Sequence, residues 1–216
     1  MLNLGKEFHT MQDKQIIITI GREYGSLGHL IAEKVGEELE LPVLDRDFFR
    51  QMSINHGVDP KFVREHDEKK RNLFITRQRR GYSNSMEDIV AEMVFDYERE
   101  LAETGESLII VGRCAEWVLR DFPNLIRIFI TADDDTKAQR IAEMENVDLE
   151  EAAKIVKKKD KKRGAYHEYY TGLKWGVANE YDLCVNSSEI GVEGAAKLIL
   201  QYVEDWKEVH STEECE

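Results

Sequence analysis

A glycine-rich turn between a short apolar run and a helix-forming stretch constrains the fold of this chain more than any other feature. The apolar run is Ile16–Ile20, the turn is Gly21–Gly28 with the sequence GREYGSLG, and a helix is expected over Leu30–Glu40. Strand, glycine-rich turn and helix in this order aim backbone N–H groups at a phosphate, and glycines allow the backbone to approach it closely. The segment therefore predicts a phosphate-binding loop.

The loop departs from the usual phosphate-binding signature, which places Lys and then Ser or Thr after its last glycine. Here His29 and Leu30 follow Gly28. Ser26 can offer its hydroxyl to a phosphate or to the shell of a Mg²⁺ ion. A tight turn that binds no ligand is the alternative, and the loop by itself leaves it open.

Short apolar runs alternate with amphipathic stretches along the whole chain. Strands of four to six residues separated by helices imply an α/β fold with a parallel sheet covered on both faces. We expect strands at Ile16–Ile20, Leu41–Leu44, Leu108–Val111, Ile126–Ile130 and Leu183–Val185, and helices that include Met86–Glu103, Asp134–Glu145, Leu149–Lys162 and Gly191–Trp206. Residues 1–216 are interpreted as one domain with a helical insert at 52–82.

Composition limits the classes of function. The net charge is −13, so a nucleic-acid-binding surface over the whole protein is not expected. The cysteines number 3 and form no CxxC pair, which argues against a disulfide framework and favours a reducing, cytoplasmic setting. Neither a secretory signal nor an apolar run of membrane-spanning length is visible, so we expect no membrane partner.

Charged residues follow two of the expected strands. Asp45 ends the second, where it can hold a Mg²⁺ shell or a substrate hydroxyl, and Arg50 lies one helical turn further on, where it can bind a phosphate bidentately. The alternative is a helix N-cap and a surface arginine. Arg113 follows the buried run 109–111, a place where a guanidinium needs an anionic partner. Cys114 is expected to be a buried thiol.

A basic run, Lys154–Arg163, stands out in this acidic chain. Lys159 and Arg163 share one helix face, with Asp160 beside them, and can neutralise transferring phosphates. A solvated helix face is the alternative. A second basic cluster, Arg77–Arg80, has no interleaved aromatic residues to support nucleic-acid binding. The aromatic residues after the basic run, from Tyr166 on, are expected to pack the helix onto the sheet.

In order and spacing, these segments resemble the cytidylate kinase-like branch of the nucleoside monophosphate kinases. The resemblance rests on ITIGREYGSLGHLIAEKV, on Asp45 with Arg50, on VGRCAEWVLRDFPNLIRIFITA, on KDKKR at 159–163 and on DLCVNSS at 182–188. It implies a P-loop three-layer α/β/α fold with a mainly parallel five-stranded sheet, a lid at 149–172 and a small helical acceptor-binding insert. It also implies phosphoryl transfer from ATP, with Mg²⁺, to CMP or dCMP.

The resemblance further implies the site residues. Donor phosphates would lie against Gly21, Tyr24, Gly25, Ser26, Leu27, Gly28 and His29. Asp45, Arg50 and Arg113 would hold the acceptor. Lys159, Asp160 and Arg163 would act at the transferring group, with Arg22 in place of the absent lysine. No protein metal site is expected.

Two residues depart from the family pattern. Gly28 stands at the lysine position, and Cys114 replaces the acid that helps to read the cytosine amino group. The first departure leaves a second hypothesis open, a nucleotide-binding sensor or regulator with little or no kinase turnover. A third hypothesis, an interaction or nucleic-acid module, is disfavoured by the net charge. The oligomeric state is not predicted.

Overall fold

The computed structural model describes residues 15–45, 47–49 and 86–211. Its sheet contains β1 (Ile17–Arg22), β2 (Val43–Leu44), β3 (Leu108–Ile110), β4 (Leu125–Thr131) and β5 (Leu183–Asn186). The order is β2-β3-β1-β4-β5, and every neighbouring pair is parallel. The chain moves to one side of β1 and later crosses to the other, so the strand order reverses at β1. Ligands of open α/β sheets bind at the carboxyl ends of the strands at such a reversal.

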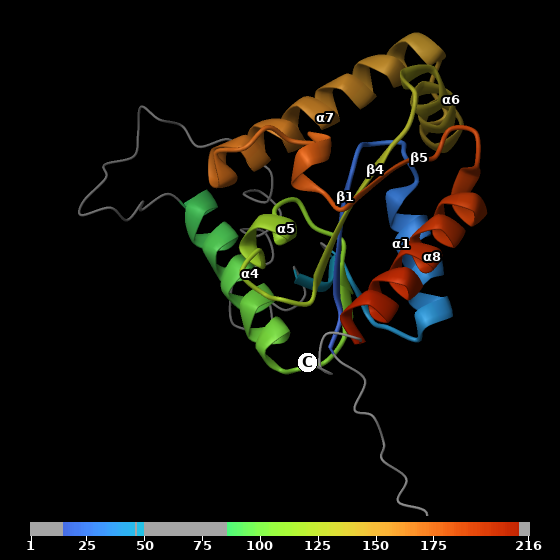
Figure 1. The fold of residues 1–216 in the computed structure, drawn as a ribbon. Helices are drawn as coiled ribbons and strands as arrows, with labels where there is room; N and C mark the ends of the chain where they lie inside the picture. The colour runs from blue at the N-terminus through green and yellow to red at the C-terminus, as the bar shows by residue number, and fades with distance from the viewer. Residues whose placement is uncertain (1–14, 46, 50–85, 212–216) are drawn as a thin grey trace, which may run out of the picture.

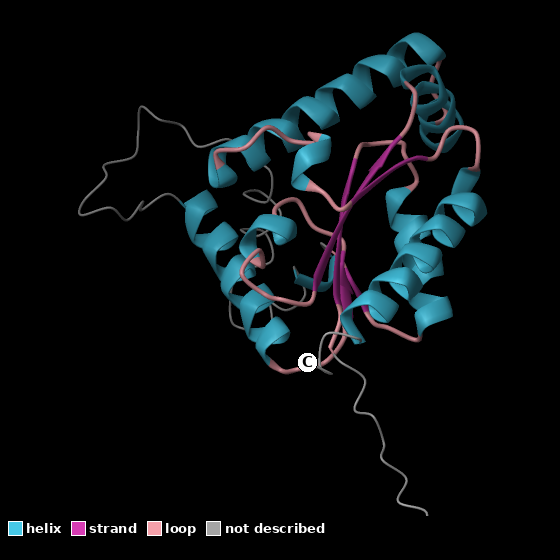
Figure 2. Cartoon of the chain, viewed as in Figure 1, coloured by secondary structure: helices cyan, strands magenta, loops and turns pink. Residues whose placement is uncertain are grey.

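Helices cover both faces of the sheet, which confirms the predicted three layers (Figure 1, Figure 2). On one face, α1 (Gly28–Leu39) and α8 (Gly191–Ser211) pack in a cluster with Ile18 and Ile20. On the other, α4 (Met86–Glu103) and α5 (Ala115–Val118) pack in a cluster with Ile17. Successive side chains of a strand point to opposite faces, so one strand serves both clusters.

Two further helices lie at the carboxyl end of the sheet. They are α6 (Asp134–Glu145) and α7 (Leu149–Thr171), and α7 runs across the strand ends (Figure 1). Asp148 caps α7 as its position suggests, because its Oδ1 accepts a hydrogen bond from the Glu151 N–H at 2.8 Å. A short 3₁₀ helix, η1 (Ala178–Glu180), precedes β5.

The expected end of α7 at Lys162 is wrong. The helix continues through Gly164 to Thr171, and Gly172, with a φ of 72°, forms its left-handed C-cap. The extra turns carry Tyr166 and Tyr170 onto the cluster around β3 and α4, as their predicted packing role requires. Apolar contact therefore outweighs the low helix propensity of a single glycine.

The predicted strands agree with the observed ones to within two residues. The insert expected at 52–82, Arg50 and the Arg77–Arg80 cluster lie outside the described residues. Within the described part of the chain, no helix is both long enough and apolar enough to cross a membrane.

Candidate active site

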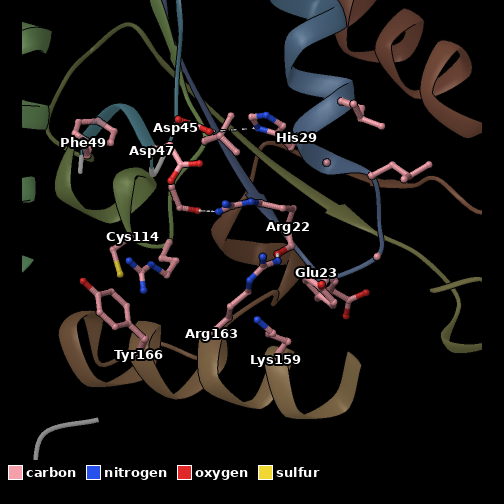
Figure 3. Close-up of a pocket in the computed structure, with 18 of the residues that line it drawn as sticks. Arg22, Glu23, His29, Asp45, Asp47, Phe49, Cys114, Lys159, Arg163 and Tyr166 are labelled. Carbon is pink, nitrogen blue, oxygen red and sulfur yellow. Dashed lines mark hydrogen bonds and ion pairs between the residues drawn. The ribbon is translucent and has the colours of Figure 1, made fainter. Parts of the chain in front are cut away.

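A cavity of about 1050 Å³ opens at the carboxyl end of the sheet, beneath α7. Its walls come from the β1–α1 loop, the end of β2, α4, the β3–α5 loop, α6 and α7 (Figure 3). Segments far apart in the sequence therefore meet at the point where the strand order reverses. The volume is that of a large ligand site.

The β1–α1 loop has the backbone shape of a phosphate-binding turn. Gly25 and Leu27 both adopt positive φ, 84° and 61°, and α1 begins directly after Leu27. If Gly28 takes the lysine position of the signature GxxxxGK, the second signature glycine falls at Leu27 and the first at Arg22. Leu27 thus adopts the conformation that normally requires glycine there. The loop keeps the shape of the signature although two of its glycines are replaced.

Arg22 occupies the space into which a side chain at position 28 would project. A Cβ built on Gly28 would lie 2.5 Å from the Cβ and 2.9 Å from the Cγ of Arg22. Separations under 3.0 Å are not found for real Cβ atoms. The glycine and the cation of the usual signature are therefore exchanged: the basic side chain enters from position 22 and the glycine stands at position 28.

The Arg22 guanidinium reaches across the cavity to the β3–α5 loop. Its Nη1 donates to the Gly112 carbonyl at 2.6 Å, and the Arg22 carbonyl accepts from Nη1 of Arg163 at 2.9 Å. Figure 3 shows Arg22, Arg163 and Lys159 converging between the loop and α7. A guanidinium carries five N–H donors in a fixed plane, a geometry suited to binding phosphate oxygens.

An ion network centred on the buried Lys137 holds the loop against α6 and α7. Lys137 Nζ lies 3.0 Å from Glu23 Oε2, 2.9 Å from Asp134 Oδ1 and 3.6 Å from Asp160 Oδ2. Burial lowers the pKa of Lys137, but the bonds to Asp134 and Glu23 outweigh it and leave the pKa above its ordinary value. Thr131 Oγ1 also donates to Glu23 Oε2, at 2.6 Å. The network fixes the loop at Glu23, the residue that follows β1.

Asp160 ties α7 to the loop. Its Oδ1 accepts from the Tyr24 backbone N–H at 2.7 Å. Burial raises the pKa of Asp160, while the Tyr24 N–H and Lys137 oppose the rise. Lys159 Nζ and the Arg163 guanidinium lie 5.4 Å and 5.5 Å from the centre of the Tyr24 ring, within cation–π range. These contacts hold α7 against the loop at Tyr24.

The other end of the cavity lies at β2 and β3. Asp45 Oδ1 accepts from the Phe48 N–H at 3.0 Å, so the predicted alternative of an N-cap holds, and its Oδ2 is 3.9 Å from His29 Nδ1. The Arg113 guanidinium stacks over the Tyr166 ring at 4.2 Å. Cys114 is 1% exposed, and burial raises the pKa of its thiol far above the ordinary value, as expected for an inert thiol.

Most of the predicted site residues line this one cavity. They are Arg22, Tyr24, Gly25, Leu27, Gly28, His29, Asp45, Arg113, Lys159 and Arg163. Gly21, Ser26 and Asp160 are not among the lining residues. A Cβ on Gly21 would meet the Phe129 ring at 2.9 Å, so this glycine permits packing of the sheet. The Ser26 side chain is fully buried and donates to the Glu23 carbonyl at 2.8 Å, so it shapes the loop from behind.

Sequence reasoning missed several residues that the structure brings to the site. Arg140, which lies within the predicted helix Asp134–Glu145, donates to the Gly25 carbonyl at 3.2 Å and to the Ser187 carbonyl at 2.8 Å. Nothing in the sequence marked Glu23 or Lys137 as site residues. Their role follows from the ion pair between them, which joins segments far apart in the chain. Glu98 lies among apolar neighbours on the buried face of α4, a pattern that could have drawn attention to it in the sequence.

The parallel sheet with its reversal at β1, the glycine loop and the basic helix closing over it define a kinase of the P-loop type. The model of the cytidylate kinase-like family matches residues 17–189, and the chain belongs to this family. Its members are nucleoside monophosphate kinases, and the chain is a kinase of this class.

The relatives are distant in sequence but similar in length. The chain is 25% identical over 197 residues to a cytidylate kinase of Haloarcula marismortui, covering 88% of this chain and 91% of the relative. For a cytidylate kinase of Methanocaldococcus jannaschii the identity is 24% over 200 residues, with 89% and 99% covered.

Solved structures agree with the fold. An uncharacterized protein from Eubacterium ventriosum is 35% identical, with a TM-score of 0.69 over 88% of this chain and 99% of its own. A shikimate kinase from Bacteroides thetaiotaomicron is 12% identical, with a TM-score of 0.56 over 88% and 98%, and this likeness concerns the fold alone.

Proposed function

We propose that this protein transfers the γ-phosphoryl group of ATP to a cytidylate-like acceptor, CMP or dCMP, in the reducing interior of the cell. The proposal rests on the family, on the relatives named cytidylate kinases, and on a cavity with a phosphate-binding loop at one end and Arg113 at the other. Donor phosphates lie on the backbone around Gly25–Gly28, at the N-terminus of α1. The acceptor lies near Asp45, Arg113 and, outside the described residues, Arg50.

The observation that carries the proposal is the position of Arg22. Its side chain fills the volume that the signature lysine would need, so the loop has a cation of its own at the donor phosphates. Arg163 and Lys159 approach the same space from α7. Phosphoryl transfer depends mainly on positioning and on neutralising phosphate charge, and these three cations supply both.

A reaction of this kind uses Mg²⁺, and the residues present fit an ion that is carried by the nucleotide. In residues 15–45, 47–49 and 86–211, no group of three or more His, Cys, Asp or Glu side chains is arranged to hold a metal. Asp45 and Asp47 line the cavity with carboxylates, and Mg²⁺ commonly takes one or two carboxylates together with phosphate oxygens. The bound ion would neutralise phosphate charge.

Binding without turnover is the second candidate. It is favoured by the 2.6 Å bond from Arg22 to the Gly112 carbonyl, which directs one edge of the guanidinium to backbone rather than to phosphate. In that case the protein would report nucleotide levels as a sensor or regulator.

A coupled assay for ADP release, run with ATP, Mg²⁺ and a panel of nucleoside monophosphates, separates the two candidates. We expect turnover, with CMP or dCMP as the best acceptor. ATP binding by calorimetry without ADP formation from any acceptor would replace the kinase proposal with the sensor.

A further inference from the structure

Glu98 is a carboxyl group on the apolar wall of the cavity. Ala91, Val94 and Phe95 share its face of α4 and line the same cavity, and Glu98 itself is 3% exposed. Its Oε2 is buried and has no hydrogen-bond partner among the residues that the structure describes. A buried polar atom without a partner is destabilising, so its presence beside a cavity points to a ligand that supplies the partner.

The surroundings of Glu98 suit a flat polar ring. A Cβ on Gly112 would lie 3.6 Å from Glu98 Oε1, so the carboxyl lies beside the loop that presents Arg113. Arg113 in turn stacks on Tyr166, which lines the same cavity. Apolar side chains together with one or two placed polar groups are typical of pockets for heterocycles.

The protonation state of Glu98 decides what it can bind. Burial raises the pKa of Glu98 to about 8, and the charge of Glu116 adds to the rise, while Arg113 and Arg99 oppose it. Glu116 lies on α5 and is hydrogen-bonded to His167 Nε2 at 2.7 Å, and the Cys114 thiol is a further titratable neighbour of Glu98. At neutral pH Glu98 is therefore a neutral acid, with one O–H donor and one carbonyl acceptor.

We propose that Glu98 reads the base of the acceptor nucleotide, by donating to the ring nitrogen N3 and accepting from the 4-amino group of cytosine. This inference rests on the proposed function and names the residue that gives that site its base specificity. An ionised Glu98 would still accept from the amino group but would repel the N3 lone pair. A neutral acid at this position takes over the base-reading role for which Cys114 has no suitable group.

Calorimetry with CMP, and with the analogue that carries hydrogen in place of the 4-amino group, tests the inference without requiring turnover. The variants are Glu98→Ala, Glu98→Gln and, as a matched control on the exposed face of α4, Glu100→Ala. We expect Glu98→Ala to weaken CMP binding on the order of 10- to 100-fold and to bring CMP and the analogue to similar affinities. Glu100→Ala should bind as the wild type does.

The pH dependence of the affinity for CMP is a second test, and it can be carried out even if Glu98→Ala fails to fold. Between about pH 6.5 and about pH 9, wild-type affinity for CMP should fall as the acid ionises, whereas Glu98→Gln, a fixed donor and acceptor, should keep its affinity. Equal losses for CMP and the analogue in Glu98→Ala, or the same alkaline fall in Glu98→Gln, would overturn the inference. Absence of turnover with every acceptor would overturn the proposed function alone, since binding still decides the role of Glu98.

Discussion

Exchanging the residues at positions 22 and 28 tests whether Arg22 performs the task of the signature lysine. Arg22→Gly removes the cation, Gly28→Lys adds one at the usual position, and the double variant restores Gly at 22 and Lys at 28. Arg22→Ala would not serve in the double variant, because the 2.5 Å contact involves the Cβ that alanine keeps. The exchange separates the identity of the cation from the position at which it enters the cavity.

The structure sets the expected magnitudes. Gly28→Lys alone forces Cβ atoms to within 2.5 Å, and overpacking of this kind costs about 1–3 kcal/mol, which should appear as a lower thermal unfolding midpoint. Arg22→Gly should lower kcat about 10²–10³-fold, the loss typical of removing one hydrogen-bond donor to the transition state. Because residue 22 ends β1, the glycine should also lower the free energy of unfolding by about 0.5–1 kcal/mol. The double variant should recover at least about tenfold of the lost kcat, since the contact is relieved and a cation returns.

The assay is ADP release at saturating ATP and CMP, with unfolding midpoints measured on the same samples. Arg120→Ala is the matched control, because Arg120 is exposed and stacks on Trp117 away from the residues that line the cavity. The reasoning fails if Arg22→Gly retains kcat to within about twofold of the control, or if Gly28→Lys is as stable as the wild type.

Three further outcomes follow from the buried charges. The pKa of Glu98 is raised from 4.5 to about 8, so between these pH values the folded state holds a proton that the unfolded state releases. The free energy of unfolding of the wild type, relative to that of Glu98→Gln, should therefore fall by roughly 3–5 kcal/mol as pH rises from 4.5 to about 8. The same pH dependence of the urea-derived unfolding free energy in both proteins would contradict this. Lys137→Met leaves Glu23 and Asp160 without their shared cation and should lower the free energy of unfolding by about 1–3 kcal/mol. An unchanged urea midpoint would show that the network is not stabilising. Arg140→Ala removes the bonds to the Gly25 and Ser187 carbonyls and should weaken ATP binding on the order of tenfold in calorimetry, and an unaltered dissociation constant would assign Arg140 to packing only.

Local patterns were enough to predict the sheet. Each strand is a short apolar run, and a run such as Ile16–Ile20 can be buried on both faces only inside a parallel sheet covered by helices. The cap at Asp148 was likewise predicted, because N-capping depends on neighbours three residues away. The end of α7 was predicted wrongly at Lys162, since Tyr166 and Tyr170 extend the helix through contacts with α4 that are distant in the chain.

The sequence by itself determined the class of fold, the glycine-rich loop after the first strand and the basic residues that could serve a phosphate site, because hydrophobic periodicity, turn chemistry and residue order are local properties. Only the tertiary structure decided which of those groups share the cavity. It showed that Arg22 excludes a side chain at 28, that Ser26 and Asp160 support the loop from outside the lining, and that Glu98 stands buried beside Arg113. Such facts depend on excluded volume and on burial, and both arise only when distant segments are packed together.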